Sequence, residues 1–153
     1  MVHTSHSECL LRELIEKVFQ VKHEKTKKIE PYYDIDILFT YKGQKYGIEY
    51  DGAMYHKEPR TIDTDERKVR AFTEQQQIKF IRVRERGCAS FDKNNAPAEL
   101  IELPKSFSKL VTEKREASII KLLTEIGKYI VGEDYEISED ACSLVSDFIN
   151  RAN

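Results

Sequence analysis

The residues with the clearest capacity for chemistry are four carboxylates in two closely spaced pairs. Asp34 and Asp36 lie in the stretch YYDIDILFTY, and Glu49 and Asp51 lie in YGIEYDG. Both stretches have the alternation and the β-branched and aromatic residues of strands, in which successive side chains point to opposite faces. Each pair therefore occupies one strand face. Two such pairs brought together repel one another unless a cation lies between them.

The dipeptide KG at positions 42–43 separates the two predicted strands and indicates a hairpin. A two-residue loop and a four-residue loop both pair positions whose numbers add up to 85, which places Asp36 opposite Glu49. Asp34 is expected opposite Asp51 by the same rule. Directly opposed side chains have Cβ atoms about 4.5–5.5 Å apart, and like charges there destabilise a sheet. A three-residue loop would shift the register and separate the pairs.

The oxygen-only character of these side chains suits Mg²⁺, which uses one or two carboxylates together with water and substrate phosphate. Such an ion can activate water and stabilise charge that develops on a phosphate under attack. The hairpin therefore predicts a Mg²⁺ site, with Mn²⁺ as a substitute. The alternative is a solvated hairpin face, on which Asp51 before Gly52 is a simple turn residue.

The elements that must position these carboxylates begin with an expected helix. Apolar residues at helical spacing predict it over residues 7–20, with Ser7 as N-cap. Residues 21–30 fit either an irregular first strand or a loop. After the hairpin, residues 52–61 are expected to form a loop and residues 63–77 a short polar helix.

The second half of the chain is expected to be mostly helical. IKFIRVRE at 78–85 predicts a strand, and a loop containing Pro97 and Pro104 should lead into one long helix over about 105–131. Ser138 is expected to cap a closing helix. The order of helix, strands, helix, strand and helices predicts a small α/β layer in one domain, residues 1–153.

Composition narrows the class of protein. The formal net charge of −2 makes no global case for nucleic acid, so any basic surface must be local. No apolar run approaches the roughly 18 residues of a membrane span, which predicts no membrane association. Three widely separated cysteines argue against a disulfide framework and favour a reducing, cytoplasmic address: Cys9, Cys88 and Cys142.

The order of short motifs resembles the PD-(D/E)XK nuclease superfamily and, within it, the very-short-patch-repair-type endonucleases. DID, IEYDG, YH, D-x-x-K and IKFIRVRE follow one another over roughly residues 7–88. The resemblance implies a restriction-endonuclease-like core, a mixed β-sheet flanked by helices in the order αβββαβ, at about residues 5–88. A helical extension would follow at about residues 105–151.

The resemblance also implies a set of metal ligands. Asp36 matches the first metal-binding aspartate, and Glu49 matches the acid of the second motif. The backbone carbonyl of Tyr50 would join them. Glu8 matches a glutamate that completes the metal shell or orients its water.

Three further matches concern the chemistry around the metal. His56 matches the histidine of the very-short-patch-repair branch, and Asp65 and Lys68 match the acid and base of the second core helix. Asp51 stands where the superfamily has the lysine that orients the attacking water. His56 is the first candidate to replace that lysine and Lys68 is the second, while Asp51 can instead act as a metal ligand.

Basic residues form short groups that could hold phosphates electrostatically. Lys27 and Lys28 precede the hairpin, and Arg67 and Arg70 lie on the predicted helix. These two groups are expected to flank the carboxylates. Each group taken alone, like the pair Arg82 and Arg84 on one strand face, is usually solvated surface.

The sequence thus predicts a Mg²⁺-dependent DNA endonuclease, acting in DNA repair, restriction or anti-phage defence, or a mobile element. An alternative is a nuclease-like DNA-binding module without catalysis, which the missing motif lysine favours. A further alternative is a nuclease subunit that is active only with a partner protein. DNA is the expected ligand, and a homodimer or a larger complex is an expected assembly.

Overall fold

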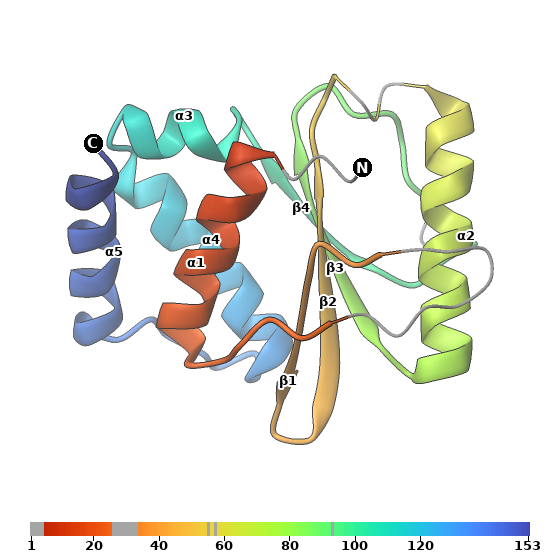
Figure 1. Cartoon of the computed structure of the whole chain (residues 1–153), viewed down its shortest axis with the longest axis horizontal. Coiled ribbons are helices and arrows are strands. Elements are labelled where there is room, and N and C mark those ends of the chain that lie inside the picture. The colour runs from red at the N-terminus through yellow and green to blue at the C-terminus, as the bar shows by residue number, and fades with distance from the viewer. Residues whose placement is uncertain (1–4, 26–33, 55, 57, 93) are drawn as a thin grey trace. The chain divides into compact units, whose positions relative to one another are not determined.

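The computed structural model describes residues 5–25, 34–54, 56, 58–92 and 94–153. The described elements follow in the order α1, β1, β2, α2, β3, β4, α3, α4, α5, which confirms the α/β class (Figure 1). They belong to two compact units. The sheet unit is Lys22–Pro104, and the helical unit combines Met1–Val21 with Lys105–Asn153. None of the described helices combines the length and the apolar character needed to cross a bilayer.

The sheet unit contains a four-stranded mixed sheet in the order β1-β2-β3-β4. The strands are β1 (Ile37–Tyr41), β2 (Gln44–Asp51), β3 (Lys79–Glu85) and β4 (Glu99–Leu103). β1 pairs with β2 in antiparallel fashion, whereas β2, β3 and β4 are mutually parallel. The parallel strands end at the same edge of the sheet, so residues near Asp51 and Glu85 are brought together there.

The hairpin has the predicted register. Pairs run from Ile37 with Ile48 to Tyr41 with Gln44, so the numbers of paired residues add up to 85 as predicted. Lys42 and Gly43 have φ of 47° and 82°, so the loop is a two-residue turn with positive φ at both positions, as in type I′. Glycine adopts this conformation readily, whereas lysine is strained in it.

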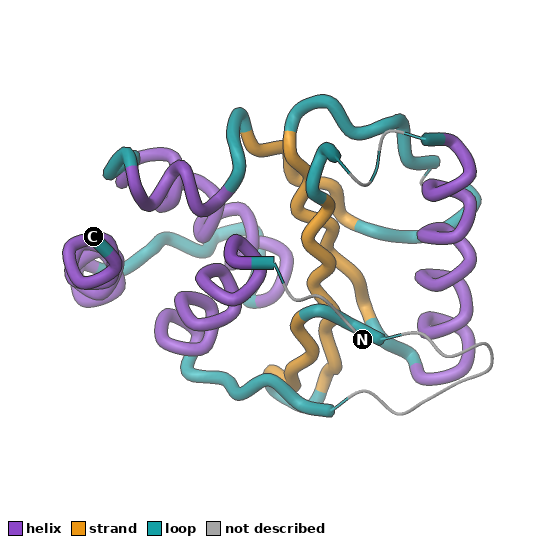
Figure 2. The backbone as a smooth tube through the Cα atoms, turned by 45° about the horizontal axis from the view of Figure 1, so that its top comes forward, coloured by secondary structure: helices purple, strands orange, loops and turns teal. Residues whose placement is uncertain are grey.

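Helix α2 (Pro59–Gln76) connects β2 to β3 and lies along one face of the sheet in both views (Figure 1, Figure 2). It begins at Pro59, four residues before the predicted start, because proline suits the first helical position. Its stripe of Ile62, Val69 and Phe72 packs into a core that includes Phe80 of β3. The Phe80 ring lies over Gly47 of the neighbouring strand β2, where an added Cβ would lie only 2.7 Å from the ring.

Two predictions for the second half of the chain are wrong. Residues 99–103, expected in a loop, form strand β4, with Ile101 and Leu103 buried. The expected long helix over 105–131 is two helices, α3 (Phe107–Thr112) and α4 (Glu116–Ile130). The chain turns between them at Lys114, which has a φ of 56°. Lysine gives no sequence signal for such a break.

The helical unit consists of α1 (His6–Phe19), α3, α4 and α5 (Glu139–Ala152). Ser138 caps α5 as predicted, since its Oγ accepts a hydrogen bond from the Ala141 N–H at 3.1 Å. The N-cap of α1 is Ser5 and not Ser7. Ser7 is buried, and its Oγ accepts a hydrogen bond from the Ser108 N–H of α3. Helix α1, assigned by the resemblance to the nuclease core, therefore groups with the C-terminal helices.

The turn can be tested by substitution. Gly43→Ala should lower the free energy of unfolding by about 1 kcal/mol, because an L-residue is strained at positive φ. Nothing lies within 4 Å of the added methyl group, so the loss reports backbone strain and not a clash. Lys42→Asn should raise the same quantity by roughly 0.5 kcal/mol, since asparagine tolerates the left-handed region. Urea denaturation of the three proteins measures both; equal stability of Gly43→Ala and wild type would contradict the turn.

Candidate functional site

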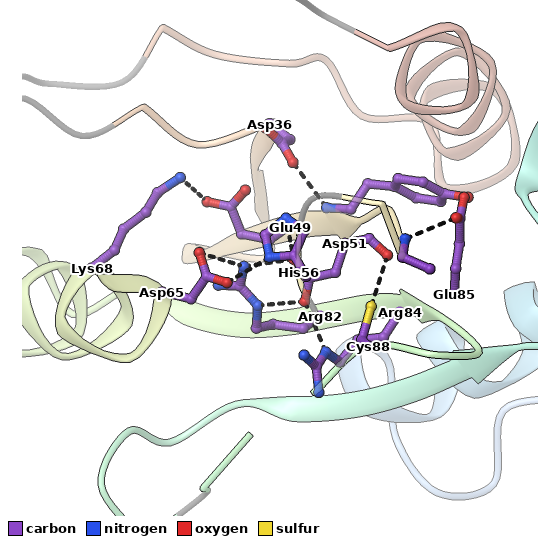
Figure 3. A network of polar contacts seen from close by, with 12 residues as sticks. Asp36, Glu49, Asp51, His56, Asp65, Lys68, Arg82, Arg84, Glu85 and Cys88 are labelled. Atoms are coloured by element: carbon purple, nitrogen blue, oxygen red, sulfur yellow. Dashed lines mark hydrogen bonds and ion pairs between the residues drawn. The ribbon is translucent and has the colours of Figure 1, made fainter. Parts of the chain in front are cut away.

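The site occupies the face of β2 and β3 that α2 covers. The parallel register pairs Glu49 with Arg82 and Asp51 with Arg84, so these four side chains share one face of adjacent strands. Asp65 and Lys68 approach from α2 (Figure 3). His56 lies in the segment between β2 and α2. The polar cluster therefore combines two strands, a helix and the segment that joins them.

Asp51 is the most heavily bonded carboxylate of the cluster. Arg82 donates to it through Nε at 2.8 Å and Nη2 at 2.6 Å, and Arg84 donates through Nε at 3.0 Å. The exposed fractions of these residues are 1% for Asp51, 2% for Arg82 and 8% for Arg84. Burial pushes the pKa of Asp51 upward, but the hydrogen bonds and charge of Arg82 outweigh it and hold the pKa below its ordinary value.

The two guanidinium groups also stack against an aromatic ring. The Arg82 and Arg84 guanidinium carbons lie 5.3 Å and 5.7 Å from the ring centroid of Phe91. A cation near a buried ring face is stabilised by the ring quadrupole. Phe91 thus helps to hold both cations in the position that Asp51 requires.

His56 is held between two carboxylates. Its Nδ1 lies 2.6 Å from Asp65 Oδ2, and its Nε2 lies 3.6 Å from Asp51 Oδ1. Arg82 Nη2 is also 3.4 Å from Asp65 Oδ1, so one arginine touches both acids that flank the ring. Burial lowers the pKa of His56, but the hydrogen bond to Asp65 and the charge of Asp51 outweigh burial and raise it.

The predicted acid pair meets a lysine. Lys68 Nζ forms an ion pair with Glu49 Oε1, and Glu49 is 3% exposed. Asp36 Oδ2 accepts a hydrogen bond from the Tyr50 N–H at 2.8 Å, so this carboxylate is bonded to the residue that follows Glu49. Lys68 of α2 thus meets Glu49 directly, whereas Asp36 is tied to the backbone of the same strand. Figure 3 shows the Glu49 carboxylate turned toward Lys68.

The second predicted pair is wrong. The β1–β2 ladder ends at the pair Ile37–Ile48 and includes neither predicted acid pair. Asp34 is exposed, whereas Asp51 is buried and bonded to arginines. The two arginines correct another expectation. Arg82 and Arg84 were expected at a solvated surface, yet both are buried. A charged pair on the same strand face as an acidic pair of the neighbouring strand was the sequence signal for this contact.

The remaining predicted residues have different surroundings. Glu8 lies in the first turn of α1 in the helical unit, and its role at the metal stays a prediction. Lys27 and Lys28 fall outside the described residues. Arg67 and Arg70 are exposed on α2, where Arg67 pairs with Asp63 at 2.6 Å and Arg70 donates to the Asn95 carbonyl.

Two sets of donors can be compared as cation sites. Ligand atoms of Asp51, His56 and Asp65 all lie within 4.8 Å of one another. However, both Asp51 oxygens already accept from Arg82, and a metal would have to displace that buried cation. Asp36 and Glu49 offer oxygen donors only, and Glu49 meets a side chain with the flexibility of lysine. Carboxylate oxygens are the donors that Mg²⁺ prefers.

Two comparisons with known proteins found no match for this chain. No protein-family model matches the chain, and a search of curated proteins found no match. The chemistry of the site therefore rests on its geometry. A carboxylate pair, a lysine and an acid-bound imidazole within one cluster can bind a cation and present hydrogen-bond donors to an anionic substrate.

Removing the charge of Asp51 should destabilise the fold strongly. Asp51→Asn is expected to lower the free energy of unfolding by about 3 kcal/mol or more, because two buried arginines lose their counter-ion. Since the pKa of Asp51 is lowered in the folded protein, its stabilisation is present above the ordinary value of 3.8 and is lost as pH falls through the folded-state pKa. Urea denaturation across pH 3–7 measures both effects.

The matched control for Asp51→Asn is Asp63→Asn. Asp63 pairs with Arg67 on the exposed surface of α2, so its removal should change stability by less than about 0.5 kcal/mol. A loss of similar size in both variants would contradict the special weight of the buried cluster.

The stabilisation by His56 should depend on pH in the opposite sense to that by Asp51. The pKa of His56 is raised, so its contribution is fully present below the ordinary value of 6.5 and is lost as pH rises through the folded-state pKa. The difference in unfolding free energy between wild type and His56→Gln should therefore be larger at pH 5.5 than at pH 8.5. NMR titration of the imidazole measures the shift directly, and a pKa below the ordinary value would refute it.

Proposed function

We propose that this protein is a metal-dependent phosphodiesterase that cleaves DNA and that its sheet unit has a restriction-endonuclease-like core. The observation that carries the proposal is the ion pair of Lys68 with Glu49, beside the Tyr50 backbone N–H that binds Asp36. Two carboxylates beside one another can hold a divalent cation, and a lysine at the same carboxylate can interact with the phosphate or the attacking water. The motif lysine absent from position 51 is thus replaced in space by Lys68.

The metal site in this proposal is formed by the carboxylates of Asp36 and Glu49 and the backbone carbonyl of Tyr50. A bound Mg²⁺ supplies Lewis-acid stabilisation of charge on the phosphate and makes water more acidic. Lys68 pairs with Glu49 in the structure, so a cation held by this carboxylate would lie close to the lysine. In the proposal the Lys68 ammonium group would donate to a phosphate oxygen or orient the water.

His56 serves as a donor in this scheme. Its raised pKa extends the pH range over which the imidazolium form persists, and a cationic imidazole donates hydrogen bonds to phosphate oxygens more readily than it accepts a proton. Asp65 holds Nδ1 and so fixes the plane of the ring. His56 is therefore a better candidate for stabilising the departing oxygen than for activating water, and Lys68 takes the position near the water.

A second function is favoured by one observation. Asp51 stands at the position of the motif lysine and is saturated by Arg82 and Arg84, so it is a structural acid and not a ligand or a base. A protein that retained the nuclease framework without catalysis would be a DNA-binding module. A nuclease that requires a partner protein would resemble this module when assayed by itself.

Plasmid nicking tests the proposal. The wild-type chain should convert supercoiled DNA to open circles with Mg²⁺ or Mn²⁺ and not with EDTA. Glu49→Ala and Asp36→Asn should each reduce the rate by about 100-fold or more, and Lys68→Met by roughly 100-fold, because each removes a group that acts on the cation or the phosphate.

The control is Glu102→Ala, a carboxylate on neighbouring β4 whose side chain is 66% exposed. It should cut like wild type. DNA binding without cleavage under either metal would support the binding module, and cleavage restored by a partner fraction would support the partner-dependent enzyme. Cleavage that survives Glu49→Ala would refute the site.

A further inference from the structure

Glu85, the last residue of β3, has no part in the cluster around Asp51, but its carboxylate makes two short contacts with the β2 segment. Its Oε2 accepts from the Tyr50 hydroxyl at 2.5 Å, and its Oε1 accepts from the Ala53 backbone N–H at 3.0 Å. Figure 3 shows both contacts converging on the Glu85 carboxylate. One side chain of β3 thus bonds to a strand residue of β2 and to the segment that follows it.

The two contacts lie on the sheet face opposite the catalytic candidates. Tyr50 alternates with Glu49 and Asp51 along β2, so its side chain points to the other face. Val83 pairs with Tyr50, and Glu85 follows two residues later on that same face. Tyr50 is only 8% exposed, so its hydroxyl needs the acceptor that Glu85 provides. Glu85 therefore reaches the His56 segment from behind the sheet.

The segment that Glu85 binds is the one that carries His56. Ala53 follows Gly52, whose carbonyl accepts from the His56 N–H at 3.2 Å. The His56 carbonyl in turn accepts from the Ala89 N–H at 2.8 Å. The segment after β2 is thus bonded at Ala53 to Glu85, the last residue of β3, and at His56 to Ala89 in the chain that follows β3.

The position of the imidazole depends on this attachment. A distance of 2.6 Å between His56 Nδ1 and Asp65 Oδ2 leaves little room for movement of the backbone that carries the ring. Met54 in the same segment is 82% exposed, so packing of that side chain contributes little to holding it. Ordering such a segment costs conformational entropy, which the two hydrogen bonds of Glu85 help to offset.

We infer that Glu85, together with Tyr50, is a positioning residue: it fixes the segment after β2 and thereby holds His56 against Asp65 without touching the substrate. The catalytic consequence rests on the proposed phosphodiesterase function, whereas the structural consequence does not. A positioning error of about 1 Å can cost roughly 100-fold in rate. Loss of Glu85 should therefore reduce turnover more than substrate binding.

The experiment compares Glu85→Ala, Glu85→Gln, Tyr50→Phe and the control Glu102→Ala in the full chain. Glu85→Ala should reduce kcat for nicking by about 10- to 100-fold with KM changed less than about threefold. Glu85→Gln should stay within about fivefold of wild type, because its amide carbonyl can still accept from Ala53 and its amide N–H can donate to Tyr50. Tyr50→Phe loses one of the two contacts, so its kcat should lie between those of Glu85→Ala and Glu85→Gln.

Hydrogen exchange supplies a readout that does not need activity. The Ala89 N–H, which donates to the His56 carbonyl, should exchange at least tenfold faster in Glu85→Ala, while amides within the β2–β3 ladder keep their protection. The control variant Glu102→Ala should leave the exchange rates of the Ala89 amide and of the ladder amides unchanged. If Glu85→Ala fails to fold, Tyr50→Phe gives the same test with a smaller perturbation.

The outcomes separate the two proposals. Unchanged exchange at Ala89 in Glu85→Ala, or faster exchange with an unchanged kcat, would overturn the positioning role. An equal loss in Glu85→Gln and Glu85→Ala would also overturn it, since the amide keeps both contacts. Absence of cleavage by the wild type under either metal would refute the phosphodiesterase, and exchange at Ala89 would then decide whether Glu85 holds the His56 segment.

Discussion

The buried ion pair between Asp51 and Arg82 is the contact on which the rest of the sheet unit's polar cluster depends. Burying either charge without the other would be costly, so the two residues must be brought together as the sheet forms. The parallel register of β2 and β3 does this, with Arg84 directly beside Asp51 and Arg82 one pair away on the same face. The cluster of charged side chains therefore forms only when β2 and β3 pair in this register.

Arg82 extends this constraint to the histidine. Because it reaches both Asp51 and Asp65, it sets the spacing of the two acids between which His56 lies. The same two acids raise the pKa of the imidazole. An arginine that touches no substrate in the proposed mechanism thus helps to place the two acids that hold the histidine, although its own charge lowers the pKa of the imidazole.

The two faces of β2 contribute to the site in different ways. One face carries Glu49 and Asp51 toward α2, and the other carries Tyr50 toward Glu85. Position 51 shows how a departure from a motif can be accommodated. An acid in place of a lysine is neutralised by two arginines from the next strand, and the lysine that meets Glu49 comes from helix α2.

The sequence by itself determined the local features: the hairpin and its register, strand β2 and the cap at Ser138. These follow from alternation and turn chemistry over a few residues. Tertiary structure decided that Arg82 and Arg84 are buried, that Lys68 reaches Glu49 and that Glu85 binds the segment before His56. Those contacts join residues far apart in the chain, and only the pairing of β2 with β3 and the packing of α2 bring them within bonding distance.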